Sequence, residues 1–356
     1  MVLLFRIIEL CYCFSSCDQC VVFLNKRDPS EEETVRYEAH IISRDEAYLS
    51  RQHVIEDPSK VVVSFDLQQI LPFPKLRSSK QTFYKSRMVL YNLCFFVKNT
   101  QQGYCMCWSQ VEGGRGSNEI ATCLKKFFST YLADSRHVVF YSDGCPGQNK
   151  NRAVVAALVH LAHNSRPGQI VELKFFETGH SHMDVDSVHA SIERASEGAE
   201  IGTPGDWVQV FQSAKKSGAQ YIVDELSFRD FSDWKQVATS AFKSNALKGI
   251  ASMHCIRAAN VGGAVELQWS EGCLGPLRPV DWRCVGGQYS WGEPPRAYLN
   301  QLSLDRKNYL DSSSLVPLLR NRSNAELYFR YVSTLVPGTP QAPANDEQAG
   351  AYGSTL

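Results

Sequence analysis

The chain has 356 residues, of which 44% are hydrophobic, enough to bury the core of one large domain or two smaller ones. Its 37 lysines and arginines balance 37 aspartates and glutamates. No overall positive field therefore attracts nucleic acid, and such binding would depend on local patches. No run is apolar enough to span a bilayer, and the apolar start lacks the basic leader and cleavage site of a signal peptide.

Regularly spaced apolar residues predict a layered α/β domain with a helical extension over residues 60–241. Runs of β-branched and aromatic residues predict strands at 61–66, 88–98, 104–110, 137–143 and 170–176. Apolar residues three and four positions apart predict helices at 117–133, 150–163 and 183–195. An opening hairpin followed by alternating strands and helices predicts a mixed sheet flanked by helices, in the order typical of the ribonuclease H-like fold.

Three further regions flank this core. Residues 1–59 combine a cysteine cluster with a charged helix expected over 30–52, and are predicted to form a small N-terminal Cys-containing module. Residues 242–336 contain short strand-like runs among glycine, tryptophan and cysteine, and are expected to form an α+β C-terminal extension. Residues 337–356 are rich in Pro, Gly and Ala without periodicity, which predicts a disordered tail.

The N-terminal cysteines are the first candidate metal ligands. Four of the 12 cysteines cluster near the start of the chain: Cys11, Cys13, Cys17 and Cys20. Cys17 and Cys20 have the spacing of half a zinc site, which would need ligands from elsewhere, such as His40 or His53. The cysteine pattern otherwise favours reduced thiols over a disulfide framework and hence an intracellular protein. Structural Zn²⁺ at Cys17 and Cys20 is therefore one expected cofactor.

Two aspartates each close an apolar run. Asp66 ends the first predicted strand and Asp143 the fourth, and the ends of neighbouring strands lie side by side in such a sheet. Magnesium prefers carboxylate oxygens, and two ions roughly 3.5–4 Å apart can stabilise both the attacking and the leaving oxygen of a phosphoryl transfer. The pair thus predicts an Mg²⁺ site, although each aspartate alone could serve only as a turn or cap residue.

A third acid is expected from the helix over 183–195. Four polar side chains recur there at helical spacing and share one stripe: His182, Asp186, His189 and Glu193. The sequence leaves Asp186 and Glu193 open as the third acid, with His189 orienting water or substrate. As alternatives, His180, His182 and His189 bind zinc or form ordinary surface hydrogen bonds.

The loop directly after Asp143 is the candidate substrate-binding segment. Residues 144–152 offer glycine freedom, amides and two cations, and the N-terminus of the following helix could receive a phosphate. Four residues of this loop are expected to contact substrate: Gln148, Asn149, Lys150 and Asn151.

Several longer motifs carry a family resemblance. They are Phe65-Asp-Leu-Gln-Gln69, Tyr91-Asn92, Gly116-Ser-Asn-Glu-Ile120, Tyr141-Ser-Asp-Gly-Cys-Pro-Gly-Gln-Asn-Lys-Asn151 and the segment from Gly179-His-Ser-His182 to Asp186-Ser-Val-His-Ala-Ser-Ile-Glu193. From about Cys17 to Leu335 the chain resembles an uncharacterised domain-of-unknown-function family of animal genomes whose members look transposon-derived.

The resemblance implies a core similar to that of ribonuclease H-like DDE transposases and integrases, with Asp66 and Asp143 matching the first two acids. The expected function is metal-dependent cleavage or strand transfer on nucleic acid, with DNA as partner and a nuclear location inside the cell. The alternative is a catalytically inactive, domesticated or relic protein that binds nucleic acid or protein. Because this assignment depends on fold-level analogy and on the acids, the two interpretations stay open at the level of sequence.

Overall fold

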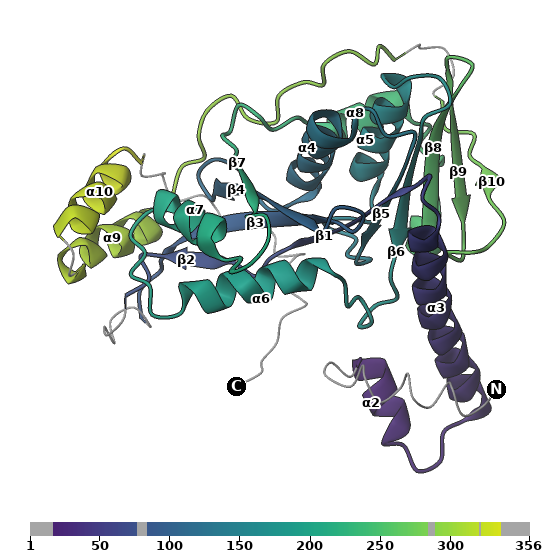
Figure 1. Cartoon of the computed structure of the whole chain (residues 1–356), viewed down its shortest axis with the longest axis horizontal. Helices are drawn as coiled ribbons and strands as arrows, with labels where there is room; N and C mark the ends of the chain where they lie inside the picture. The colour runs from purple at the N-terminus through teal and green to yellow at the C-terminus, as the bar shows by residue number, and fades with distance from the viewer. Residues whose placement is uncertain (1–16, 77–83, 284–288, 320–321, 336–356) are drawn as a thin grey trace.

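The protein is built on one mixed sheet whose strands come from most of the chain. The computed structural model describes residues 17–76, 84–283, 289–319 and 322–335. The predictions made for Cys11, Cys13 and the tail over 337–356 lie outside the described residues. Among those described, the strands form a single 10-stranded sheet with helices on both faces (Figure 1). The α/β fold class and the mixed sheet are thereby confirmed.

The strands predicted from apolar runs are present. They are β1 (Val61–Leu67), β3 (Met88–Val97), β4 (Gln102–Ser109), β5 (His137–Ser142) and β6 (Ile170–Phe175). The other described strands are β2 (Leu71–Phe73), β7 (Ile222–Glu225), β8 (Cys255–Val261), β9 (Ala264–Ser270) and β10 (Arg278–Pro279). Their order in the sheet is β10-β9-β8-β6-β5-β1-β3-β4-β7, with β2 paired to β3. β1 runs parallel to β5 and antiparallel to β3. Strands β8 to β10 of the C-terminal region extend the same sheet beyond β6, because β8 pairs with β6.

One face of the sheet is covered by helices that pack against a core rich in aromatic residues. These are α4 (Ser117–Phe127), continued by the π-helix η2 (Phe128–Leu132), α5 (Arg152–His163) and α8 (Trp234–Ala241). The Phe95 and Phe127 rings stack 4.2 Å apart between β3 and α4. Nearly all of α5 is buried, as expected for a helix that is apolar on every side. Burial of the apolar surface between these helices and the sheet stabilises the strands at whose ends Asp66 and Asp143 lie.

The opposite face is covered by a second set of helices, which includes α6 of the candidate site. They are α3 (Glu31–Glu56), α6 (Val185–Ser196), α7 (Pro204–Ser213), α9 (Arg306–Leu315) and α10 (Arg322–Ser333). The described residues also form two 3₁₀ helices, η3 (Ile250–Ser252) and η4 (Val316–Leu318). On α6 the predicted apolar stripe is confirmed, because Val185, Val188 and Ile192 are fully buried. Because these apolar residues face the core, Asp186 and His189 of α6 are only partly buried.

The described N-terminal region contains two helices, and α2 and the start of α3 project beyond the sheet while the rest of α3 packs on it (Figure 1). The short helix α2 (Asp18–Leu24) contacts α3 through stacked Phe23 and Tyr37 rings, 4.1 Å apart. Ser30 caps α3 through a capping box with Glu33, which explains why the helix starts where it does.

Pro72 lies inside β2, because β2 pairs with β3 alone and a proline is tolerated where a strand needs no hydrogen bond on its other side.

Candidate functional site

Asp66 and Asp143 lie at adjacent strand ends, as the sequence predicted. The parallel β1–β5 register pairs Ser64 with Tyr141, so two residues further along each strand the two aspartates follow side by side. Burial is the main reason why the pKa of Asp66 is raised to about 8, and the charges of Asp143 and Asp186 raise it further. Three carboxyl groups therefore share one poorly solvated region, where a bound cation would favour their ionised forms.

The loop after β5 holds the Asp143 carboxylate in place. Its Oδ1 accepts hydrogen bonds from the Cys145 backbone N–H, at 3.3 Å, and from the Asn149 side-chain amide. Burial nevertheless raises the pKa of Asp143, against the opposing effect of these two bonds. The glycine-containing loop thus serves first to orient the second acid.

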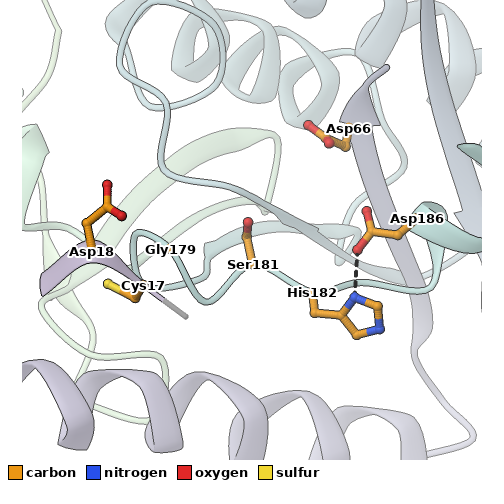
Figure 2. Close-up of a pocket in the computed structure, with 7 residues that line it drawn as sticks. All are labelled: Cys17, Asp18, Asp66, Gly179, Ser181, His182 and Asp186. Atoms are coloured by element: carbon orange, nitrogen blue, oxygen red, sulfur yellow. Dashed lines mark ion pairs between the residues drawn. The ribbon is translucent and has the colours of Figure 1, made fainter. Parts of the chain in front are cut away.

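Helix α6 supplies two further groups to this region. One ligand atom each of Asp66, Asp186 and His189 lies within 4.8 Å of the other two. The Oδ2 atom of Asp186 accepts a hydrogen bond from the Met183 N–H at 2.8 Å and lies 3.0 Å from His182 Nδ1 (Figure 2). Burial raises the pKa of Asp186, which is the same effect as at the other two acids. The first turn of α6 therefore faces the end of β1.

His189 is a half-buried side chain whose Nε2 atom is fully buried. Burial lowers its pKa to about 4, so the imidazole is neutral near pH 7. Among the described residues its Nε2 atom has no hydrogen-bond partner, although it is buried. A buried ring nitrogen without a partner costs free energy unless something absent from the protein chain binds it. A neutral imidazole next to two carboxylates is a donor set that fits a divalent cation.

The structure distinguishes between the acids that the sequence left open. Glu193 is exposed on α6 and does not belong to the group formed by Asp66, Asp186 and His189. Asp184 pairs instead with Arg51 of α3 and, at 3.1 Å, with Lys98. Asp186 is thus the helical acid that the fold brings to Asp66.

Sequence analysis missed the residues that fix α6 on the sheet. Ser64 Oγ in β1 accepts a hydrogen bond from the Val185 N–H at 3.2 Å, at the start of α6. Buried Gln68 reaches the His189 carbonyl at 3.4 Å and accepts a bond from the Asn92 amide at 3.0 Å. Gln68 and Asn92 lie within two of the motifs that carried the family resemblance, and that position was the available signal.

The four predicted substrate-binding residues make contacts within the protein. Asn149 binds Asp143, and the amino group of Lys150 is buried and donates to the Ala251 carbonyl at 2.9 Å. Asn151 caps α5, because its Oδ1 accepts from two amides of the first turn, and Gln148 contacts the Arg115 carbonyl at 3.4 Å. A role for these residues in binding substrate stays a prediction.

A second group of metal-type ligands lies close by. Cys17 Sγ is 3.4 Å from His40 Nε2, and Cys20 Sγ is 3.2 Å from His180 Nε2. The two imidazole Nε2 atoms are 3.1 Å apart, and all four ligand atoms lie within 4.8 Å of one another. Zinc takes two thiolates and two imidazoles in a tetrahedron with bonds of about 2.0–2.3 Å, which separates the ligand atoms by roughly 3.3–3.8 Å. The cluster could therefore hold a metal ion such as zinc.

The histidines are distributed differently from the sequence-based expectation. Of the two histidines predicted as additional zinc ligands, His40 lies beside Cys17 and Cys20. His53 is exposed near the end of α3. His180 completes the cysteine cluster and His182 pairs with Asp186, so these neighbours belong to different sites.

One open cavity connects the two groups. It encloses about 360 Å³ and has Cys17, Asp18 and Gly179 at one end. Asp66 and Asp186 lie at its other end, and the segment carrying Ser181 and His182 runs between them (Figure 2). A ligand entering this cavity would meet the carboxylates with the cysteine cluster beside it.

The fold and site define a class: an α/β protein with a mixed sheet, buried carboxylates at the ends of its strands, and a Cys₂His₂ cluster that could bind metal. Within that class, the chain belongs to the domain of unknown function family DUF7869, whose sequence model matches residues 86–270. No curated protein matches the chain, and no solved structure does. Asp143, His180, Asp186 and His189 lie inside the matched range, whereas Cys17, Cys20, His40 and Asp66 precede it. In the part of the chain that the structure describes, no helix is both long and apolar enough to cross a membrane.

Proposed function

We propose that this chain is a transposase-derived protein that cleaves or joins phosphodiester bonds in nucleic acid, acting on DNA in the nucleus. The observation that carries the proposal is the convergence of Asp66, Asp186 and His189, with Asp143 at the adjacent strand end. Mg²⁺ held by the three aspartates is the cofactor of this proposal, since it prefers carboxylate oxygens.

The arrangement of the central strands supports the proposal. β1 lies between antiparallel β3 and parallel β5, with β4 beside β3 and β6 beside β5. An antiparallel hairpin followed by parallel strands is what the ribonuclease H-like interpretation requires. The acids that the resemblance assigns as first and second end the adjacent strands β1 and β5.

The residues divide the chemistry among them. When bound, the metal ions stabilise charge on the attacking and leaving oxygens of the phosphodiester. Asp66 and Asp143 hold them from the rigid sheet, and Asp186 closes the site from the first turn of α6. His189 remains neutral and buried, and its Nε2 orients a water molecule or a substrate oxygen.

The test is DNA cleavage by the full chain in Mg²⁺ or Mn²⁺, with plasmid, duplex and single-stranded DNA as probes. We expect Asp66→Asn and Asp186→Asn to lower the rate by more than about 100-fold, because loss of a charged ligand weakens both ion binding and transition-state stabilisation. Glu197→Gln, at the exposed end of α6, is the matched control and keeps the wild-type rate. Equal rates for wild type and Asp66→Asn, or no metal-dependent cleavage of any probe, would overturn the proposal.

The balanced charge of the chain favours a second candidate function. In that case the protein is a catalytically inactive, domesticated or relic copy that binds nucleic acid or protein with the same fold. Gel-shift measurements with the same DNA probes separate the two candidates. If the protein is a binding module, the wild type and Asp66→Asn shift DNA equally well, and neither cleaves any of the probes.

We further propose that structural zinc occupies the Cys₂His₂ cluster. The support is the full set of two thiols and two imidazoles within 4.8 Å, with three of the four side chains buried. Metal analysis of the purified full chain is expected to find one zinc per chain, and none in a Cys17→Ser/Cys20→Ser variant. A zinc-free wild-type protein, purified with zinc present, would contradict this assignment.

A further inference from the structure

Helix α3 contacts the segment that leads into α6 at three successive points. His40 is in the cysteine cluster with His180, Tyr48 donates a hydrogen bond to the His180 carbonyl at 2.9 Å, and Arg51 pairs with Asp184. Tyr48 and Arg51 follow His40 by eight and eleven residues, so the three side chains lie on one side of the helix. The segment over 177–184 is thus attached along the length of α3.

Glu177 joins the cysteine cluster to the sheet. Its Oε1 lies 3.3 Å from His40 Nδ1, and its Oε2 lies 3.4 Å from His254 Nε2, just before β8. The other nitrogen of His254 lies 2.6 Å from the Glu271 carbonyl oxygen. A carboxylate on the outer nitrogen of a ligand histidine fixes the ring orientation and leaves the inner nitrogen free for metal. For His40 that inner nitrogen is Nε2, which faces Cys17 and His180.

The backbone at Gly179 requires close contact with the cluster. Its φ is +79°, and a Cβ at this position would lie 2.8 Å from both Cβ and Sγ of Cys17. Cys17 Sγ also lies 3.5 Å from the Thr178 carbonyl. Cys17 therefore packs directly against the turn that precedes His180.

From this turn to the acid site the chain is short. Six residues after His180 comes Asp186, whose carboxylate is held by Met183 and His182 of the same segment. The cysteine cluster and the acid site also share one cavity (Figure 2). Residues 180–186 are therefore the direct connection along the chain between the cysteine cluster and the acid site.

We propose that zinc in the Cys₂His₂ cluster fixes residues 177–186 and thereby positions Asp186, with Glu177 as a positioning residue that orients His40 and anchors the cluster to β8. This inference rests on the zinc occupancy proposed above. It does not depend on whether the acids catalyse a reaction.

Two measurements on the full chain, made without DNA, test the inference. In the first, zinc affinity is measured by competition with a chelator. Glu177→Gln is expected to weaken zinc binding roughly 10–100-fold, the usual effect of losing a carboxylate behind a ligand histidine. His53→Ala, which removes an exposed histidine from the same helix α3, is the matched control and leaves the affinity unchanged.

In the second measurement, amide hydrogen exchange is compared with zinc bound and with zinc removed by the chelator. We expect faster exchange over 178–189 on removal, with the central strands unchanged, and recovery when zinc is added back. Because the wild-type chain is used, folding of a variant is not in question. Unchanged exchange at 185–189 after zinc removal, or wild-type zinc affinity in Glu177→Gln, would overturn the inference. Failure of DNA cleavage would contradict only the proposed phosphodiester chemistry.

Discussion

The two ends of the cavity are built in opposite ways. At the acid end, Asp66 and Asp143 come from strands paired along their length in the buried sheet. At the cysteine end, the ligands come from helices α2 and α3 and from a loop, and these helices expose large apolar side chains such as Val22 and Ile42. Sheet hydrogen bonds organise the first end, whereas shared ligands organise the second. Each end therefore depends on a different kind of contact.

The largest effect expected at the acid end alone comes from Asp66→Asn in the metal-free protein. The folded-state pKa of Asp66 is about 8, raised from 3.8, so the folded protein holds a proton that the unfolded chain releases above pH 4. The free energy of unfolding of the wild type therefore decreases as the pH rises from about 4 to 8. The asparagine variant has no carboxyl group at this position and does not show this decrease. At pH 9 we expect the variant to be more stable by roughly 6 kcal/mol, because each pKa unit between 3.8 and 8 corresponds to about 1.4 kcal/mol.

Chemical denaturation of both proteins across this pH range measures the difference. Zinc content is the control, since the substitution leaves all four ligands of the Cys₂His₂ cluster in place. A constant stability difference between pH 4 and 9 would show that the Asp66 carboxyl is not perturbed by its surroundings.

A smaller effect is expected from Gln68→Ala. The substitution removes the link between α6 and the sheet and leaves the buried Asn92 amide without its Gln68 partner. The free energy of unfolding should fall by about 1–3 kcal/mol, the usual cost of an unsatisfied buried group. Denaturant titration measures the fall, and retained zinc shows that the damage stays at the acid end. An unchanged free energy of unfolding would contradict this prediction.

The smallest effect is expected from Glu193→Gln. Its side chain is exposed and lies apart from the acid group, so stability should change by less than about 0.5 kcal/mol and metal-dependent cleavage by less than about twofold. A loss of cleavage as large as that of Asp186→Asn would instead assign Glu193 as the third acid.

Local periodicity predicted the parts of the fold that depend on neighbouring residues. The apolar runs gave β1 and β5, and helical spacing gave the buried stripe of Val185, Val188 and Ile192. The proximity of Asp66 and Asp143 followed, since adjacent strand ends meet at one edge of a sheet. These features could be predicted because each depends on a repeat that is visible within a few residues.

The remaining features depend on contacts between distant segments. His180 meets Cys20 across 160 residues, and no local pattern connects them. The sequence grouped His182 with Asp186 and His189 on one helix, but α6 begins only at Val185, so helical spacing does not apply to residue 182. Gln68 was missed because its partners lie in β3 and α6, which only the folded sheet brings together.

The spacing of the Cys₂His₂ ligands along the chain has a consequence for biosynthesis. Cys17, Cys20 and His40 leave the ribosome early, whereas His180 follows only after β1 to β6 have been made. During synthesis the first three ligands can hold an ion only incompletely. The full set can form only after β1 to β6 have been synthesised, so a completed cluster would mark chains whose synthesis has passed His180.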